Sequence, residues 1–289
     1  MRVREIEVQE LREIRGAPWR DENHRVWVDG RSAYVPVREG WPCTHDLPPR
    51  KPYSGRGYYM MGNVAILHGD DPSEKEITDV VEWTGAEGVM LVRSCEGRER
   101  IPDTEVVFGT VGEVCHHEAG IRYHTDPRRL MFSMGNRDEK ARLCRFVRPG
   151  ERVADMFAGI GYFSLPLALK GARVHAMEIN PPAYRFLMRN IEENGVSHCV
   201  HAEPGDCRDL LRGVYDRILM GHFESEQFLP SALAHAGPGT VLHVHSAGKT
   251  PPELEETIRA HGFFGTVTPR KVKKYAPYQW HYVQDVILA

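Results

Sequence analysis

The segment Asp155-Met156-Phe157-Ala158-Gly159-Ile160-Gly161 is the first part of the sequence whose residue types could do chemistry. It overlaps the apolar run 153–157, which predicts a strand. Glycines placed directly after a strand let the backbone approach a ligand closely and begin the next helix tightly. On its own such a glycine pair is a weak signal, because an ordinary structural turn uses glycine in the same way.

Two acidic residues at the ends of the next two predicted strands strengthen this signal. Glu178 lies in the strand 173–179, about 20 residues after the glycines, where a carboxylate can accept both hydroxyls of a ribose. Asp206 follows the strand 199–202, where a carboxylate can accept an adenine amino group. The backbone N–H of Cys207 can then reach a ring nitrogen. Glycine turn, ribose acid and adenine acid in this order indicate a bound adenosine.

The ligand expected from these residues is an adenosine without phosphates. Dinucleotide-binding turns read G-x-G-x-x-G, whereas the third position here is Ser164, and no pyrophosphate clamp is evident. S-adenosylmethionine therefore fits better than NAD. The predicted cofactor-binding residues are Asp155, Phe157, Gly159, Gly161, Glu178, Asp206 and Cys207.

Strand and helix patterns alternate around these residues, which predicts parallel β-α-β units with the cofactor at the carboxyl ends of the strands. Asn180, Pro181 and Gly195 predict the N-cap, first residue and end of one helix. The other predicted helices cover 163–170, 226–236 and 251–261. The predicted strands are 153–157, 173–179, 199–202, 215–220, 240–246 and 280–288.

The first part of the chain predicts a smaller α/β unit. A hairpin is expected from 26–28 and 33–37, followed by a proline- and glycine-rich linker over 41–57. Further strands at 64–67, 88–92 and 105–108 and a helix at 73–83 complete it. We therefore expect an N-terminal domain over residues 1–125 and a catalytic domain over 126–289.

Composition excludes several other classes of protein. The chain has 289 residues, of which 41% are hydrophobic and 27% charged, with a net charge of −3. No apolar run is long enough for a membrane span, and charges fill the N-terminus where a signal peptide is apolar, so a cytoplasmic protein is expected. Six scattered cysteines form no C-x-x-C pair. Although His243-Val244-His245 could share a face of a strand, we expect no metal site.

The C-terminal region carries a local basic stretch. Residues 257–284 contain no acidic side chain and include Lys271, Lys273 and Lys274. These lysines, together with Tyr275 and Tyr278, are candidate phosphate-binding and base-stacking groups for RNA. The alternative is a solvated strand face with its aromatic residues in the core.

Three motifs resemble a family of tRNA-modifying enzymes that act on the guanosine 3′ to the anticodon. They are His117-Glu118-Ala119-Gly120-Ile121-Arg122-Tyr123, the segment Met131-Phe132-Ser133-Met134-Gly135-Asn136-Arg137-Asp138-Glu139-Lys140, and the glycine segment itself. The resemblance covers roughly residue 62 to the C-terminus. It implies a Rossmann-like class I methyltransferase domain with a mostly parallel seven-stranded sheet, preceded by a smaller α/β N-terminal domain that contacts tRNA.

Two segments distinguish the branches of this family. Guanine-N1 methyltransferases usually place Asn and Pro after the fourth strand, whereas this chain has Met220-Gly221-His222-Phe223. The segment 271–281 and the H-x-H at 243–245 are similar to the other branch. That branch transfers the 3-amino-3-carboxypropyl group of S-adenosylmethionine to 4-demethylwyosine in tRNA-Phe and releases methylthioadenosine.

The resemblance also implies roles for single residues. Ser133 and Lys140 correspond to cofactor contacts, although the family usually has arginine at the second position. Lysine keeps the charge but lacks the bidentate fork, and Arg142 could compensate. His222 is the candidate for a catalytic or substrate contact. Two alternatives remain, a tRNA guanine-N1 methyltransferase and a noncatalytic RNA-binding protein that keeps the fold as a scaffold.

Overall fold

The computed structural model describes residues 1–24, 26–47, 53–96, 101–132, 134–276 and 278–289. The chain divides into two compact units, residues 1–54 and 55–289, and each is described by itself. The domain boundary expected near residue 125 lies inside the second unit. The division into a tRNA-contacting part and a catalytic part at that residue stays a prediction.

The first unit is built on a small antiparallel sheet with the strand order β2-β3-β1-β4. The predicted hairpin is present as β2 and β3, with Val28 opposite Ala33. Val3 on β1 and Val35 on β3 are fully buried in its small core. The elements are β1 (Arg2–Glu7), η1 (Val8–Arg12), β2 (Trp27–Asp29), β3 (Ser32–Pro36) and β4 (His45–Asp46).

The second unit begins with a mixed four-stranded sheet and a two-stranded ribbon. The sheet has the order β5-β6-β7-β8, and α1 packs on β6 and β7. Ser73 caps α1 reciprocally with Glu76, which explains why the helix begins there. The elements are β5 (Tyr58–Met61), β6 (Val64–His68), α1 (Glu74–Thr84), β7 (Gly88–Glu96), β8 (Ile101–Gly109), β9 (Val114–Glu118) and β10 (Ile121–Thr125).

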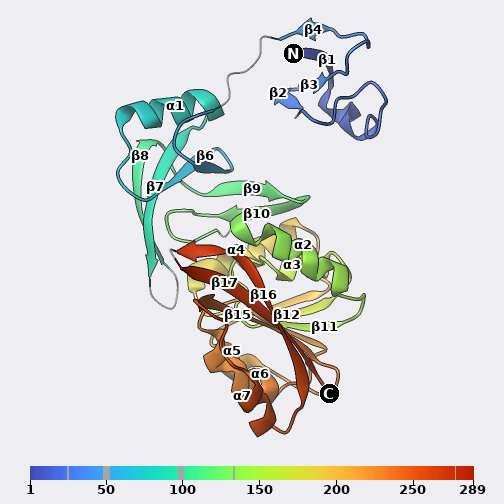
Figure 1. Cartoon of the computed structure of the whole chain (residues 1–289), viewed down its shortest axis with the longest axis vertical. Helices are drawn as coiled ribbons and strands as arrows, with labels where there is room; N and C mark the ends of the chain where they lie inside the picture. Colours follow the sequence, from blue (N-terminus) through green and yellow to red (C-terminus); the bar gives the residue numbers. More distant parts are fainter. Residues whose placement is uncertain (25, 48–52, 97–100, 133, 277) are drawn as a thin grey trace. The chain divides into compact units, whose positions relative to one another are not determined.

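A seven-stranded sheet with the order β13-β12-β11-β14-β15-β17-β16 forms the larger part of this unit (Figure 1). Among these strands β17 alone runs opposite to the other six, so the Rossmann-like class I methyltransferase fold is confirmed. The strands are β11 (Arg152–Asp155), β12 (Arg173–Glu178), β13 (Val200–Pro204), β14 (Arg217–Met220), β15 (Val241–Gly248), β16 (Gly265–Ala276) and β17 (Gln279–Leu288).

Helices connect and cover these strands. They are η2 (Met134–Asn136), α2 (Arg137–Phe146), α3 (Ser164–Ala168), α4 (Pro181–Glu193), α5 (Cys207–Leu210), η3 (Ser225–Phe228), α6 (Leu229–Leu233) and α7 (Glu255–Ala260). Helix α4 begins with Asn180 as N-cap and Pro181 as its first residue, as expected, but the Asn180 side chain makes no capping bond. In the part of the chain that the structure describes, no helix is long and apolar enough to cross a membrane.

Six strands were not predicted from the sequence, namely β1, β4, β5, β9, β10 and β16. The long strand β16 falls in the basic stretch, whose lysines hide the alternation of a half-buried strand. The short ribbon β9–β10 has a pattern of buried and exposed residues that alternates cleanly, but it lies where we had expected the domain boundary.

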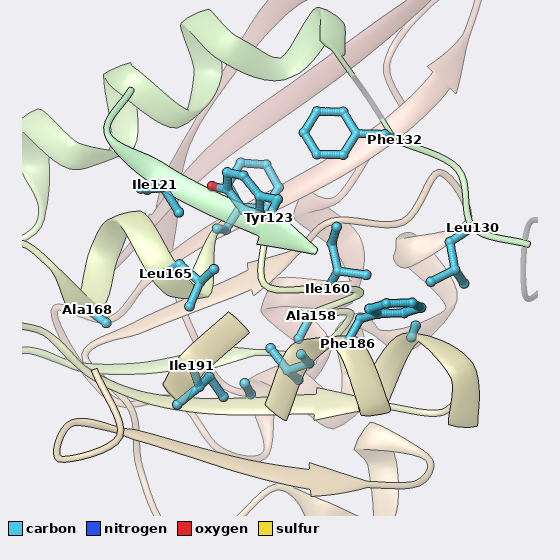
Figure 2. Close-up of a cluster of buried hydrophobic side chains, with 14 of the residues drawn as sticks. Ile121, Tyr123, Leu130, Phe132, Ala158, Ile160, Leu165, Ala168, Phe186 and Ile191 are labelled. Atoms are coloured by element: carbon cyan, nitrogen blue, oxygen red, sulfur yellow. The ribbon is translucent and has the colours of Figure 1, made fainter. Parts of the chain in front are cut away.

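One hydrophobic core joins the ribbon to the large sheet. Figure 2 shows Tyr123 on β10 close to Leu165 of α3, with Phe186 and Ile191 of α4 below them. All four side chains are buried. The core is therefore continuous across residue 125, which ties the start of the second unit to the strands that carry the glycine segment.

Asn190 is a buried polar link inside this core. Its Oδ1 accepts a hydrogen bond from the backbone N–H of His124 at 2.7 Å. Its Nδ2 donates to the carbonyl oxygens of His124 at 3.1 Å and Ile160 at 3.0 Å. Because Ile160 belongs to the glycine segment, this one side chain fixes β10, α4 and the glycine turn together.

Replacing Asn190 with alanine should lower the free energy of unfolding by about 2–4 kcal/mol, because one buried and two partly buried backbone groups lose their partners. The matched control is Asn194→Ala, since Asn194 bonds in the same way to the backbone of Arg122 where water can replace it. We expect a loss of about 1 kcal/mol or less for the control. If urea denaturation gives the same loss of unfolding free energy for both variants, the buried contacts of Asn190 contribute no more than the exposed contacts of Asn194.

Candidate active site

A cleft of about 550 Å³ lies at the carboxyl ends of the parallel strands. Residues that follow β11, β12, β13 and β14 line it, and side chains from β15, β16 and β17 complete its wall. The strand order reverses between β11 and β14, which is the position where open α/β sheets bind ligands. The volume falls within the range of about 300–1,000 Å³ that small-molecule sites occupy.

The glycine segment forms a tight turn at the edge of this cleft. Gly159 lines the cleft and has a φ of +58°, and Gly161 has a φ of +99°. A Cβ atom on Gly161 would lie 2.8 Å from the Leu165 side chain. The second glycine therefore serves the close packing of α3, while the first leaves backbone open to a ligand.

Glu178 ends β12 and lines the cleft beside this turn. Its Oε2 accepts the backbone N–H of Gly159 at 2.6 Å, and its Oε1 accepts that of Asn180 at 2.7 Å. A carboxylate oxygen can accept more than one hydrogen bond, so ribose hydroxyls can add to these contacts. The structure brings the predicted ribose acid and the glycine turn together.

Asp206 and Cys207 line the same part of the cleft at the start of α5. The Asp206 carboxylate pairs with the guanidinium of Arg208 at 2.9 Å and 2.5 Å, a partner that the sequence analysis did not anticipate. Burial raises the pKa of the Cys207 thiol to about 12. This cysteine is therefore a neutral wall residue, and its contribution to ligand binding would come from its backbone.

Asp155 lies behind the turn and outside the residues that line the cleft. Its side chain is fully buried, where it accepts a hydrogen bond from the Ser164 hydroxyl at 2.7 Å. The backbone N–H of Phe157 also points to it at 3.4 Å. Burial raises the pKa of this carboxyl to about 6. Asp155 thus stabilises the glycine turn from behind, through its contacts with Phe157 at the start of the turn and with Ser164 at the start of α3.

Phe157 and His222 form an aromatic wall of the cleft. Their ring centroids lie 5.4 Å apart, and Phe228 packs edge-on against Phe157 at 5.0 Å. The Nδ1 atom of His222 accepts the backbone N–H of Glu224 at 3.2 Å. A neutral imidazole in this arrangement carries its proton on Nε2. His222 is therefore arranged to donate a hydrogen bond from Nε2.

Lys140 lies outside the residues that line the cleft. Its ammonium group pairs with Glu118 and sits near the rings of Tyr123, Phe132 and Tyr162, at 5.3, 5.5 and 5.7 Å. Desolvation by burial lowers the pKa of this lysine. Ser133, the other residue taken from this motif, lies outside the described residues. Glu118, the partner of Lys140, belongs to the motif at 117–123, but nothing in the sequence showed that the two residues pair.

Arg142 also faces away from the cleft. Its guanidinium forms bidentate pairs with Glu139 and with Asp285 of β17. Asp285 in turn accepts from His243 at 2.6 Å, so the first histidine of the H-x-H belongs to this buried network. The expectation that Arg142 replaces Lys140 as a cofactor contact is therefore wrong, because both of its partners lie outside the cleft lining.

His245 and His281 are two cleft residues to which the sequence analysis gave no role. They are 1% exposed each and share a hydrogen bond of 2.9 Å between His245 Nδ1 and His281 Nε2. Desolvation by burial holds the pKa of His245 well below its ordinary value. Both histidines lie in segments that the family resemblance had singled out, His245 in the H-x-H and His281 at the end of 271–281.

The three lysines of the basic stretch do not share one environment. Lys273 lines the cleft, whereas Lys271 and Lys274 are exposed. The ammonium group of Lys271 lies 4.7 Å from the ring centroid of Trp280. Tyr278 is 82% exposed, so its ring is accessible for stacking.

One group of possible metal ligands exists among the described residues, outside the cleft. Ligand atoms of His175, His201 and Glu203 lie within 4.8 Å of one another. Glu203 already pairs with Arg212 through both oxygens, at 3.0 and 3.1 Å, and with His175 at 2.7 Å. This salt-bridge network accounts for the group, and the expectation that no metal binds stays a prediction.

Comparisons with known proteins agree with this geometry. The TRM5/TYW2 methyltransferase domain matches residues 114–264. The tRNA(Phe) (4-demethylwyosine(37)-C(7)) aminocarboxypropyltransferase of Pyrococcus horikoshii is 36% identical over 228 residues, which are 75% of this chain and 82% of that protein.

Solved structures give the same result. The crystal structure of P. horikoshii TYW2 in complex with MeSAdo is 30% identical, with a TM-score of 0.70, and covers 82% of this chain and 92% of its own. Trm5b from Pyrococcus abyssi is 26% identical, with a TM-score of 0.73, and covers 99% of both chains.

The buried Asp155 carboxyl should make stability depend on pH. Because its pKa is about 6 in the folded protein, above its ordinary value, folding favours the protonated form. Its stabilising contribution is complete below about pH 4 and is lost as the pH rises through about 6. The free energy of unfolding of the wild type, relative to Asp155→Asn, should therefore fall by on the order of 2–3 kcal/mol over this range. If the difference in free energy of unfolding between the wild type and Asp155→Asn, measured by urea denaturation, is the same at all pH values, the raised pKa of Asp155 is contradicted.

Proposed function

Because the chain belongs to the TRM5/TYW2 methyltransferase family, we propose that it transfers the 3-amino-3-carboxypropyl group of S-adenosylmethionine to 4-demethylwyosine in tRNA-Phe. The observation that carries this proposal is the likeness to the P. horikoshii aminocarboxypropyltransferase over three quarters of the chain. The segment after β14 supports it, since Gly221, His222 and Phe223 line the cleft where guanine-N1 methyltransferases usually place Asn and Pro.

The residues of the cleft fit the cofactor. In this proposal Glu178 binds the ribose hydroxyls, the Asp206 carboxylate and the Cys207 N–H bind the adenine, and Gly159 and Phe157 line its path. Asp155 and Gly161 act indirectly by shaping the turn. Ser133 stays a candidate contact on the family resemblance, and Lys140 would act through Glu118 and the aromatic residues around it.

The chemistry requires one bond to form and two to break. S-adenosylmethionine supplies a sulfonium whose γ-carbon is electrophilic. C7 of the base forms a bond to this carbon while the S–Cγ bond breaks, and the electron pair stays on sulfur, which leaves neutral methylthioadenosine. The proton of C7 is then lost. Positioning of the γ-carbon in line with C7 supplies most of the rate enhancement.

His222 suits a positioning role better than that of a base in this scheme. Its Nδ1 is engaged by the Glu224 N–H, so the ring offers a donor to an oxygen or nitrogen of the tricyclic base. For tRNA binding we propose Lys271 and Lys274, which are exposed on β16, with Tyr278 as a stacking surface. The N-terminal part of the chain is expected to contact the tRNA as well, and the reaction is expected in the cytoplasm.

A tRNA guanine-N1 methyltransferase is the second candidate. It is favoured by one observation, the match of Trm5b to 99% of this chain, including residues that the aminocarboxypropyltransferase does not cover. Both reactions use the same donor and differ in which carbon next to sulfur faces the base. The distinction is therefore a matter of orientation in the cleft.

Removal of the Glu178 carboxylate tests the cofactor site. Glu178→Ala should weaken S-adenosylmethionine binding at least about 100-fold in calorimetry, because two charge-assisted bonds to ribose are lost. Glu203→Ala is the control, since it removes a carboxylate on the neighbouring strand outside the cleft. Thermal unfolding of both variants shows whether they stay folded. Unchanged affinity in folded Glu178→Ala would remove the ribose assignment, and no binding by the wild type would favour a scaffold.

Two labelled samples of S-adenosylmethionine identify the transferred group. With tRNA that carries 4-demethylwyosine, we expect label from the carboxyl carbon to enter the tRNA and methyl label to remain in methylthioadenosine. Transfer of the methyl label, above all to unmodified guanosine, would instead establish the methyltransferase reaction and overturn the proposal.

A further inference from the structure

A β-bulge in β16 places Lys273 on a different face of the sheet from its neighbours. The register pairs Lys271 with Tyr282 but Lys273 with His281, so one extra residue is inserted between the two lysines. Directly paired residues of antiparallel strands point to the same face, and adjacent residues of a strand point to opposite faces. Without the bulge, Lys271 and Lys273 would share a face.

The contacts of the neighbouring side chains agree with this assignment of lysines to the two faces of the sheet. Lys271 covers the ring of Trp280, and Lys274 is paired with Trp280 in the register. Both therefore lie on the Trp280 face, while Lys273 lies on the face of His281, which lines the cleft. Bulges next to binding sites commonly redirect a side chain in this way.

The chain of Lys273 runs directly over Gly135 in η2. A Cβ atom on Gly135 would lie 2.6 Å from Lys273 Cδ and 2.8 Å from its Nζ. The glycine thus makes room for the lysine, and the ammonium group lies close to the Gly135–Asn136 end of the cleft. The segment that the family resemblance linked to the cofactor is therefore the one that Lys273 reaches from a distant strand.

Two other cations near the cleft, Lys140 and Arg142, lie outside its lining. Lys140 pairs with Glu118, and Arg142 pairs with Glu139 and Asp285. Among the described lysines and arginines, Arg208 and Lys273 line the cleft, and Arg208 forms a bidentate pair with Asp206 at the end assigned to adenine. Lys273 lies on the other half of the sheet, toward which the methionine arm must extend.

We propose that Lys273 binds the α-carboxylate of the aminocarboxypropyl arm and so orients the γ-carbon toward the base. The proposal rests on the proposed function for the identity of the ligand. An ammonium group is a compact charge that can hold a carboxylate without the planar fork of arginine. Lys273 then supplies the anchor that the family resemblance had assigned to position 140, and its role differs from that of Lys271 and Lys274.

Three ligands separate this role from others, with binding measured by calorimetry in the absence of tRNA. S-adenosylmethionine carries the whole arm, decarboxylated S-adenosylmethionine lacks only the carboxylate, and methylthioadenosine lacks the arm. Lys273→Met should weaken binding of the first ligand by about 10–100-fold, the effect of one charge-assisted contact. It should leave the other two unchanged, so that the preference of the wild type for the carboxylate disappears.

Lys273→Gln repeats the test with a polar side chain, and Arg270→Met is the matched control. Arg270 is an exposed cation on the same strand and, by the register, on the same face as Lys273, but outside the cleft lining. The control should bind all three ligands as the wild type does.

Two results would overturn the proposal. Unchanged affinity of Lys273→Met for S-adenosylmethionine would show that the carboxylate is held elsewhere, and weaker tRNA binding in that variant would then assign Lys273 to RNA. An equal loss for all three ligands would make it a wall residue only. Because no transfer is measured, these results are independent of which group the enzyme transfers.

Discussion

The carboxylate of Glu178 is the contact on which the geometry of the cleft depends. It accepts one backbone N–H from the turn after β11 and one from the start of α4, so a single side chain of β12 links these two segments. Hydrogen bonds to a charged group contribute about 1.5–3 kcal/mol each, which makes this arrangement stiff. The same side chain lines the cleft, so the residue that shapes the site is also accessible to a ligand.

Charge compensation fixes the basic side chains of α2 in place. Buried charges are costly without partners, and the acidic residues near α2 obtain theirs from that helix. Glu118 takes Arg137 and Lys140, while Asp285 takes Arg142 and His243, which together keep the pKa of Asp285 well below its ordinary value. The basic side chains of α2 therefore hold the helix to β9 and β17. Lys273, which does line the cleft, comes from a different element, β16.

The sheet itself sorts the remaining basic side chains. In a regular strand, alternate residues share a face, so Lys271 and Lys273 would lie on one face and Lys274 on the other. The irregularity between Lys271 and Lys273 reverses this order and directs Lys273, in place of Lys274, to the face of His281. The same strand therefore carries two exposed lysines, Lys271 and Lys274, and one lysine that lines the cleft.

Local chemistry was enough to predict that Phe157, Gly159, Glu178, Asp206 and Cys207 lie together, and the structure places them in one cleft. Strand, glycine turn and strand-end acid lie within a few residues of one another, and their geometry follows from backbone preferences that act over short distances. The parallel strands and the helices between them were predictable for the same reason, because each has its own pattern of apolar residues and its own start and stop residues. By contrast, β16 was missed because its charged residues hide the alternation. Partners distant in sequence were also beyond prediction, such as Arg142 and Asp285, 143 residues apart. Tertiary structure alone decided that Lys140 is neutralised by Glu118 and that Lys273 reaches the cleft, because strand register and burial depend on how the whole chain packs.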